Sequence, residues 1–276
     1  MTKKLLLMSG GMDSLACALN AMREHGPENL ISLGFNYGQR HFEQENKAAT
    51  LFCKRYNITR KILNVDISQI GGSPLIDKTL KVTTDMTKQR TTVVPQRNAI
   101  FLLFAAAYAQ ENGCDEIIHG ACAEDYEAYR DCRPVFFNLL EMAIQAGRTQ
   151  PRAGSEDICS DIVLESKHDK IDVDDECDCL YVKGGTVNIP QHKLDIKIST
   201  PLIKYKKEET MSQILKKYPV DIYKYSYTCY NGGEIQCGRC PADIERQIAF
   251  YVNKVKDPLP YLKPLSNKEL KAIIKN

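Results

Sequence analysis

The feature that most constrains the fold is a regular alternation of apolar strands and amphipathic helices, which starts at the amino terminus. KLLLM (4–8) is followed by the glycine loop SGGMDS (9–14), and then by apolar residues at helical spacing up to residue 26. The series continues with two buried strands and the helix between them, at 29–37, 61–68 and 42–57. Alternation of this kind predicts an α/β protein with a doubly wound parallel sheet.

The rest of the chain continues the pattern less regularly. RNAIFLLFAAAYAQENG (97–113) has almost no polar face, so we expect a helix that is buried against the sheet. The elements expected after it are a strand at 115–125 that ends in a loop, a helix at 134–146, a strand at 194–202, an amphipathic helix at 206–218 and a basic helix at 267–276.

The composition changes sharply after residue 148. Between 156 and 179 the chain is dense in Asp and Glu, carries cysteines and shows little apolar period. This indicates an acidic, cysteine-containing insertion or lid at 149–194, in which a small hairpin would fit. We therefore divide the chain into an α/β core at 1–148, this insertion, and the C-terminal part of the core at 195–276, which includes a cysteine segment at 226–250 and the terminal helix.

Charge and composition exclude several classes of protein. Apolar residues make up 43% of the chain and charged residues 26%, and the net charge is +2, which is atypical of disordered, membrane or strongly nucleic-acid-binding proteins. The first apolar run is too short for a signal peptide, so we expect a cytoplasmic protein. In that compartment eleven cysteines indicate metal binding and burial rather than disulfides, with core roles for Cys17, Cys53, Cys114 and Cys132.

The glycine loop has the mechanics of a phosphate cradle. Gly10 and Gly11 allow a tight turn and the close approach of an anion, and Ser9 and Ser14 offer hydroxyls. The following helix directs its N–H groups and positive dipole end at the phosphate. The loop has neither the lysine of a Walker A motif nor the GxGxxG spacing of dinucleotide sites. It predicts a nucleotide site of another class, and the alternative is a turn that only caps the helix.

SGGMDS closely resembles the signature SGGxDS of the PP-loop (N-type) ATP pyrophosphatases, whose fold is adenine nucleotide alpha hydrolase-like. The resemblance implies that the core at 1–148 binds ATP and splits it between the α- and β-phosphates, so that an oxygen of a second substrate becomes adenylated. It also implies that Asp13 helps to hold Mg²⁺. The residues expected to bind ATP are Ser9, Gly10, Gly11, Met12, Asp13, Ser14 and Arg40.

The motifs that follow resemble, in order, those of the 7-cyano-7-deazaguanine synthase family. They are FNYGQRH (35–41), VPQRN (94–98), GACAEDYEAYRDCRP (120–134), TPL (200–202) followed by Lys207 and Glu209, and SYTCYNGGEIQCGRC (226–240). Apart from the insertion, the resemblance covers nearly the whole chain. It implies a ligase that adenylates the carboxylate of 7-carboxy-7-deazaguanine, forms the amide with ammonia, and uses a second ATP to dehydrate the amide to the nitrile.

Positive groups must stabilise the charge that develops during adenylation. Because the glycine loop has no lysine, we expect the cations to come from elsewhere in the chain, and each candidate has an alternative role as a surface or structural cation. The expected catalytic residues are Asp13, Ser14, Arg97, Arg133 and Lys207.

Substrate-binding candidates follow the strand predicted at 115–125, where open α/β sheets bind ligands. They are Asp125, Tyr129 and Asp131. A carboxylate at this place would accept the N1–H and the amine of a guanine-like ring, and would discriminate against bases that leave it unpaired. The alternative for Asp131 is a cap on the helix that begins near Pro134.

The cysteine segment matches three of the four thiolates that the family supplies to structural zinc. These are Cys229, Cys237 and Cys240, and Asp243 stands in place of the fourth. Zinc accepts carboxylate oxygen, so a Cys₃Asp site would keep four tetrahedral ligands, and we expect a zinc-binding helical segment here. The alternatives are completion by a cysteine of the insertion or by water, and no metal. A redox C-x-x-C would need a different structural context.

Three departures from the family pattern leave the nucleophile open. Gln96 stands for glycine, Asp243 for cysteine, and the insertion is far longer than usual. One alternative is a related antiphage-defence enzyme that attaches a deazaguanine to the amino terminus of a partner protein, which an acidic insertion would attract. Another is a non-enzymatic, zinc-containing nucleic-acid binder, supported only by the basic tail and the cysteines. Family members commonly form dimers, and the C-terminal segment permits a homodimer.

Overall fold

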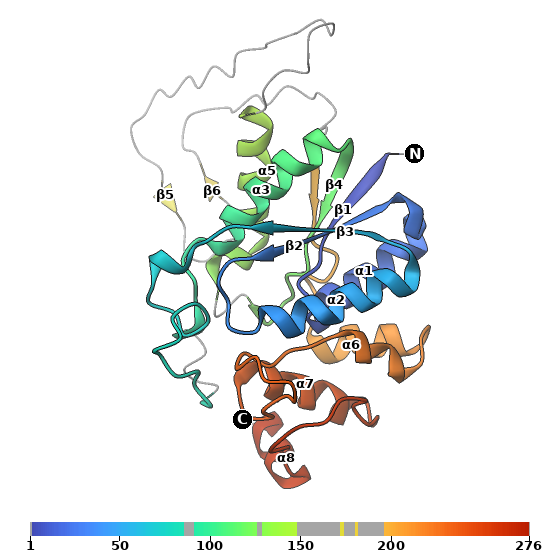
Figure 1. The fold of residues 1–276 in the computed structure, drawn as a ribbon, viewed down its shortest axis with the longest axis vertical. Coiled ribbons are helices and arrows are strands. Elements are labelled where there is room, and N and C mark those ends of the chain that lie inside the picture. The colour runs from blue at the N-terminus through green and yellow to red at the C-terminus, as the bar shows by residue number, and fades with distance from the viewer. Residues whose placement is uncertain are drawn as a thin grey trace, which may run out of the picture.

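A five-stranded parallel sheet forms the centre of the protein (Figure 1). The computed structural model describes residues 2–85, 91–125, 129–147, 172–173, 180–181 and 196–275. The strands, in the spatial order β3-β2-β1-β4-β7, are β3 (Thr59–Asn64), β2 (Leu30–Asn36), β1 (Lys3–Leu7), β4 (Cys114–Ile118) and β7 (Lys197–Ser199). The order reverses between β1 and β4, and ligands of open α/β sheets bind at such a switch point.

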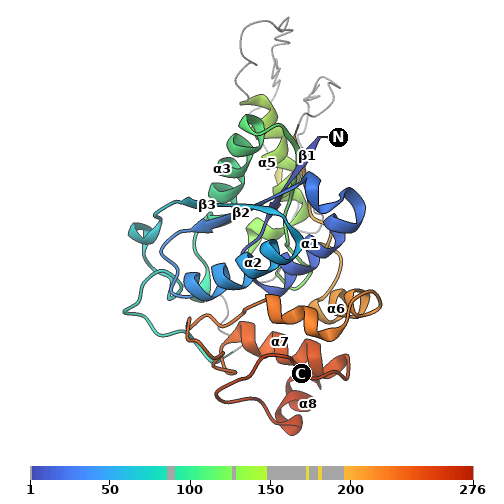
Figure 2. The same cartoon turned by 45° about the vertical axis from the view of Figure 1, so that its right-hand side comes forward.

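Helices cover both faces of the sheet, which confirms the doubly wound arrangement (Figures 1 and 2). Leu6 of β1 packs into one core with α1 (Met12–His25) and α2 (Phe42–Tyr56). Its neighbour Leu5 points to the other core, with α3 (Arg97–Glu111) and α5 (Pro134–Ala146). Successive residues of a strand face opposite sides, so the apolar run KLLLM serves both cores.

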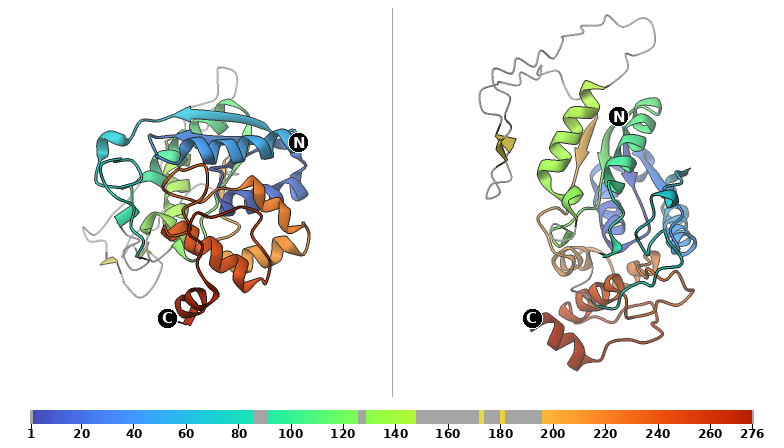
Figure 3. Two further views of the ribbon diagram at one scale, coloured as in Figure 1. Left: turned by 60° about the horizontal axis from the view of Figure 1, so that its bottom comes forward. Right: turned by 90° about the vertical axis from the view of Figure 1, so that its left-hand side faces the viewer.

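The C-terminal elements cover the carboxyl end of the sheet and are built into its core. They are α6 (Lys207–Leu215), the 3₁₀ helix η5 (Val220–Tyr225), α7 (Pro241–Val252) and α8 (Asn267–Lys275). Met211 of α6 and Phe250 of α7 belong to the same apolar core as α1. Figure 3 shows these segments, in orange and red, stacked on the end of the α/β layers.

A buried arginine holds this C-terminal region together. The Arg246 side chain is 0% exposed and donates to both carboxylate oxygens of Asp257, at 2.7 and 2.9 Å. It also donates to Ser226 Oγ at 2.7 Å and to the Tyr223 carbonyl at 3.2 Å. Loss of either Arg246 or Asp257 would leave the charge of the other buried without a partner. The pair therefore favours one arrangement of the C-terminal region.

Most sequence-predicted elements are confirmed, although several differ in where they begin or end. β3 begins two residues earlier and ends four residues earlier than expected, because the chain turns into the short 3₁₀ helix η2 (Ser68–Ile70). α3 packs against the sheet as expected, through Leu102 and Ala105, although Leu103 and Phe104 are 51% and 46% exposed. Within 149–194 the described residues form two short antiparallel strands, β5 (Asp172–Val173) and β6 (Leu180–Tyr181), and the rest of that expected insertion lies outside the described residues.

Two further short helices with described bounds connect elements of the core. They are η1 (Pro27–Asn29) and η4 (Arg130–Cys132). No helix among the described residues has both the length and the apolar character that a bilayer crossing demands.

Candidate active site

The glycine loop lies at the carboxyl end of β1 and is closed by its own hydroxyls. Ser14 Oγ accepts from the N–H of Gly10 at 3.2 Å and donates to the Gly11 carbonyl at 3.0 Å. Ser9 Oγ accepts from the Gly11 N–H at 3.1 Å and lies 3.2 Å from Ser14 Oγ. These hydrogen bonds hold the loop in shape before any ligand binds. α1 starts at Met12, directly after the two glycines, and its first N–H groups lie at the switch point.

Gly10 is required by two features of this turn. Its φ of +114° lies in a region that favours glycine, and a Cβ at this place would stand 2.2 Å from the carbonyl oxygen of Glu45 in α2. The carbonyl of Gly10 in turn accepts from the Tyr227 N–H at 2.8 Å. The loop is thus held between α2 on one side and the C-terminal region on the other.

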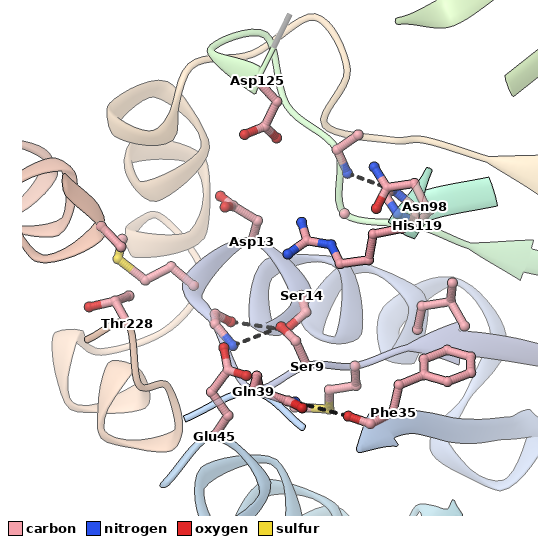
Figure 4. A pocket seen from close by; sticks show the side chains of 18 of the residues that line it. Ser9, Asp13, Ser14, Phe35, Gln39, Glu45, Asn98, His119, Asp125 and Thr228 are labelled. Atoms are coloured by element: carbon pink, nitrogen blue, oxygen red, sulfur yellow. Dashed lines mark hydrogen bonds between the residues drawn. The ribbon is translucent and has the colours of Figure 1, made fainter. Parts of the chain in front are cut away.

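The loop opens into a cavity of about 270 Å³ that lies between the sheet and the C-terminal elements (Figure 4). Ser9, Gly11, Met12, Asp13 and Ser14 line one part of it. Asp13 is buried there, which raises its pKa to about 7 although the Lys207 ammonium opposes the shift. A bound cation would stabilise the ionised form of Asp13. This carboxyl group can therefore bind a cation at neutral pH.

Lys207, the first residue of α6, is the cation of this region. Its ammonium lies 3.2 Å from Glu245 of α7, and 3.7 to 3.9 Å from Glu124, Asp125 and Asp13. Burial alone would lower the pKa of Lys207, but the carboxylates outweigh burial and hold its pKa well above the ordinary value. The lysine is therefore always charged, and the sequence correctly placed it with Asp13 although nearly two hundred residues separate them.

Asp125 lines the cavity on the same side as Lys207. Its carboxylate accepts from the Cys122 N–H at 3.1 Å, and Figure 4 shows Asp125 and Asp13 facing the same open space. The loop after β4 therefore supplies a second acidic side chain next to the glycine loop.

The far part of the cavity is lined by an arginine among aromatic rings. Arg97 begins α3, and its guanidinium donates to Tyr37 Oη at 3.4 Å and lies 5.9 Å from the centroid of that ring. Phe101 is tilted against Tyr37 at 5.1 Å, and Tyr129 and Tyr230 complete the surround. No described carboxylate lies within 4.0 Å of Arg97, so this cation is available to an anionic ligand in a pocket that suits a flat ring.

Two histidines missed by sequence reasoning also line the cavity. His119, at the end of β4, accepts from the Ala121 N–H through Nδ1 at 3.1 Å, and burial lowers its pKa to about 4. It is therefore neutral and presents Nε2 as a donor. His41 is 4% exposed and burial lowers its pKa to about 3, so it is neutral as well.

Glu45 of α2 was also missed, and it lines the cavity beside the glycine loop (Figure 4). Its Oε2 lies 3.6 Å from His41 Nε2, and burial raises its pKa to about 8. Since both groups are uncharged at neutral pH, they form a polar contact rather than an ion pair. The sequence QRHFEQE shows that His41 and Glu45 lie four residues apart, the spacing of neighbours on a helix. It does not show that this side of the helix faces the cavity.

Besides Gly10, which shapes the loop through its backbone, three expected site residues do not line the cavity. Arg40 donates to the carbonyls of Asp77 and Leu80, both at 2.9 Å, and so holds a loop. Arg133 is the N-cap residue of α5. The third is Asp131, whose Oδ2 accepts from the N–H at the second residue of α3, at 3.2 Å, rather than capping α5. Long-range contacts, invisible in a motif, decide all three placements.

The four expected metal ligands do come together. One ligand atom from each of Cys229, Cys237, Cys240 and Asp243 lies within 4.8 Å of the other three. Ligand atoms of a tetrahedral zinc thiolate site lie about 3.8 Å apart when the Zn–S bonds are about 2.3 Å. Three thiols and one carboxylate, all of them partly or wholly buried, therefore fit a metal ion after small movements, and no cysteine of the insertion is needed.

The metal cluster and the cavity share one helix. Cys240 and Asp243 lie at the start of α7, whose residues Ala242, Glu245 and Arg246 line the cavity. Gly232, in the preceding loop, has a φ of +74° and packs so closely that a Cβ would lie 2.3 Å from the Arg40 carbonyl. A metal ion at this place would fix the start of α7 and, with it, the side chains that α7 turns toward the cavity.

Comparisons with known proteins agree with this geometry. A family model described as queuosine biosynthesis protein QueC matches residues 3–254. The chain is 33% identical over 269 residues to 7-cyano-7-deazaguanine synthase of Thermoplasma volcanium, which covers 95% of this chain and 91% of the relative. It is 30% identical over 264 residues to the enzyme of that name from Campylobacter fetus, with coverage of 94% and 97%.

Proposed function

Because this chain belongs to the family of the queuosine biosynthesis protein QueC, we propose that it acts as a 7-cyano-7-deazaguanine synthase, a ligase that forms carbon–nitrogen bonds. The proposed substrates are 7-carboxy-7-deazaguanine, ATP and ammonia. One observation carries the proposal: the glycine loop with Lys207, and Arg97 with its aromatic surround, line the same cavity. A nucleoside triphosphate and an aromatic carboxylate can therefore bind next to each other in this cavity.

The first chemical step is the transfer of AMP to the carboxylate of the deazaguanine. A carboxylate oxygen attacks the α-phosphorus, the bond to the β-phosphate oxygen breaks, and pyrophosphate leaves. The first N–H groups of α1, which have no partner within the helix, would face the phosphates, and the Lys207 ammonium would offset the negative charge that builds up there. Mg²⁺, which we propose Asp13 helps to bind, would supply further positive charge to the phosphates.

The second substrate is proposed to bind among the aromatic residues. Its flat ring fits the surround of Tyr37, Phe101, Tyr129 and Tyr230, and the Arg97 guanidinium is free to face its carboxylate. Asp125 stays our candidate acceptor for the N1–H and amine of the ring, because it lines the cavity at the carboxyl end of the sheet.

One expected residue takes part indirectly in this proposal. Asp131 fixes the first turn of α3 through the Asn98 N–H, so it positions Arg97. We assign no step to Arg40 or Arg133, because neither lines the cavity.

The activated acyl group is then attacked by nitrogen. Ammonia adds to the acyl carbon and AMP leaves, because a phosphate ester is a far better leaving group than oxide. A second ATP activates the resulting amide oxygen in the same cavity, and loss of AMP with two protons gives the nitrile. Both half-reactions use the same phosphate site, which explains why one cavity is sufficient.

We propose zinc for the Cys₃Asp cluster. Thiolate sulfur is the ligand type that zinc prefers in structural sites, and one carboxylate completes four ligands. The ion would supply folding free energy and hold α7 rather than act on the substrates.

Transfer to the amino terminus of a partner protein stays a prediction, as does a homodimer. The insertion on which the first depends lies outside the described residues except at 172–173 and 180–181. A purely nucleic-acid-binding role has no support from the relatives, which are named as synthases.

The direct test is incubation with Mg·ATP, 7-carboxy-7-deazaguanine and ammonia. We expect AMP and pyrophosphate in amounts that depend on the deazaguanine, and a product lighter than the substrate by conversion of its carboxyl group to a nitrile. Formation of ADP would contradict adenylation. Mass spectrometry of proteins encoded nearby, added to the same mixture, distinguishes a modified protein from the free nitrile.

A further inference from the structure

The carboxylate of Asp243 is divided between two sets of neighbours. Oδ2 accepts from the Gly238 N–H at 2.8 Å and lies 3.3 Å from Cys237 Sγ. Oδ1 lies 2.9 Å from the hydroxyl of Thr228, whose proton is shared with Gln236 Oε1 at 2.7 Å. One oxygen therefore faces the sulfur ligands while the other is held on the opposite side.

Thr228 belongs to the cavity as well as to the metal cluster. It lines the cavity, and Figure 4 shows its side chain at the edge of the space that Asp13 and Glu45 face. Its neighbour Tyr227 donates through its N–H to the Gly10 carbonyl of the glycine loop at 2.8 Å. A two-residue segment thus joins the phosphate loop to the ligand set of the metal.

We propose that Thr228 is a positioning residue that holds Asp243 in its metal-binding orientation, and so couples metal retention to occupancy of the ATP cavity. The inference rests on the metal proposed for this cluster, but not on the identity of the nucleophile. A hydrogen bond to the ligand's second atom fixes which oxygen faces the metal, and removal of such partners typically weakens metal binding about 10–100-fold.

The need for this partner follows from the aspartate itself. A thiolate binds through a single atom, whereas a carboxylate can rotate and exchange its two oxygens. Asp243 is 0% exposed, so no solvent is available to hold the oxygen that does not face the sulfurs. The Thr228 hydroxyl donates to that oxygen from the cavity side. Any ligand that orders Thr228 therefore also orders Asp243.

Coupling of this kind is reciprocal. If nucleotide in the cavity tightens metal binding at equilibrium, the metal must tighten nucleotide binding by the same factor. A second connection supports the direction of the effect, because Glu245, two residues after Asp243 on α7, lies 3.2 Å from the Lys207 ammonium. Both connections run from the start of α7 to the phosphate side of the cavity.

The experiment measures the rate at which zinc-loaded full-length protein passes its metal to a chromophoric chelator, with and without Mg·ATP. Thr228→Val should release zinc about ten times faster than the unaltered protein, whereas Thr228→Ser, which keeps the hydroxyl, should stay within twofold. Mg·ATP should slow release at least threefold in the unaltered protein and by a clearly smaller factor in Thr228→Val, where only the connection through Glu245 remains. Equal rates for the valine and serine variants would overturn the proposal.

Asp243→Cys provides the matched background. With four thiolates no carboxylate needs holding, so Thr228→Val should change the release rate less than twofold in this variant. An undiminished effect there would mean that Thr228 acts only through packing, and would overturn the positioning role. Circular dichroism of each variant checks folding. Equilibrium dialysis with ATP separates a failure of coupling from a failure of the ATP site, since absence of ATP binding would count against the proposed function itself.

Discussion

Lys207 Nζ lies 3.2 Å from Glu245 Oε2, and this contact joins the first residue of α6 to the second turn of α7. Both side chains are nearly buried, at 11% and 14% exposure, and both line the cavity. The pair brings a permanent cation to the glycine loop from a distant part of the chain. We propose that Lys207 serves the phosphates as a lysine within the loop does in Walker A proteins.

Replacement of Lys207 by Met should abolish most of the activity. Loss of one preorganised group that stabilises transition-state charge typically costs about 10²–10³-fold in rate. We expect a loss of that size in deazaguanine-dependent AMP formation, measured at saturating Mg·ATP. Lys204→Met is the matched control, because Lys204 is exposed and does not line the cavity. A fully active Lys207→Met protein would remove this lysine from the mechanism.

Arg97→Met should act on the acceptor more than on the nucleotide. Since Arg97 lies among the aromatic residues, its loss should raise the KM for 7-carboxy-7-deazaguanine at least tenfold and change the KM for ATP by less than threefold. Steady-state kinetics with each substrate varied in turn give both values. Arg130→Met, at an exposed position, should leave both unchanged. A rise confined to the KM for ATP would move Arg97 to the nucleotide side.

The buried Glu45 should make the protein less stable as pH rises. Its pKa is about 8 in the folded state against an ordinary value of 4.5, so between these values the folded protein keeps a proton that the unfolded chain has released. The free energy of unfolding therefore falls with increasing pH in this window, by up to about 1.4 kcal/mol per pH unit. His41 has the opposite effect, but only below its ordinary pKa of 6.5.

Comparison of Glu45→Gln with the unaltered protein isolates this effect. Urea unfolding at pH 6.5 and pH 8 should show a decline for the unaltered protein that is much smaller in the variant, which has no proton to lose. Asp13, with a pKa of about 7, adds to the decline equally in both proteins. Parallel declines in the two proteins would show that Glu45 does not keep its proton when buried.

Gln96→Gly should stabilise the protein. Gln96 is exposed and adopts a φ of 56°, the left-handed region that costs most residues about 1–2 kcal/mol and costs glycine almost nothing. Allowing for the greater freedom of glycine in the unfolded chain, we expect a gain of about 0.5–1 kcal/mol in urea unfolding. Gln96→Ala keeps the strain and should show no gain, and equal stability of the glycine and alanine variants would contradict this explanation.

Cys240→Ser should remove most of the bound metal. The thiol is 1% exposed and is one of four grouped ligands, so its loss leaves an incomplete site. Elemental analysis should find about one metal ion per chain in the unaltered protein and far less in the variant, together with a lower melting temperature. Cys114→Ser is the control, because that cysteine is a core residue of β4 and should keep the metal even if stability falls.

The sequence predicted the parts of the structure that depend on local pattern. The helix expected at Pro134–Ala146 has those bounds in the structure, because a proline and an apolar period mark it. The glycine loop and the cluster of three cysteines and Asp243 likewise form as expected. The residues of each group are close in sequence and suit one kind of ligand, a phosphate or a metal ion.

Residues placed by long-range contacts were beyond such reasoning. Arg40 was expected at the nucleotide, but carbonyls some forty residues away hold its guanidinium. Asp131 was expected at the substrate or at the next helix in sequence, yet it binds the start of α3, which precedes it by more than thirty residues. Both are polar residues within strong motifs, and only the packing of the elements decides which backbone groups they reach.

The pairing of β7 with β4 has a consequence for how the protein unfolds. Glu116, Ile117 and Ile118 pair with Lys197, Ile198 and Ser199, so the last strand of the sheet is contributed by the far side of the expected insertion. The region that carries the cysteine cluster cannot detach while this edge of the sheet remains. Heating should therefore give one calorimetric peak, with the enthalpy from its shape equal to the enthalpy from its area, rather than separate melting of two halves.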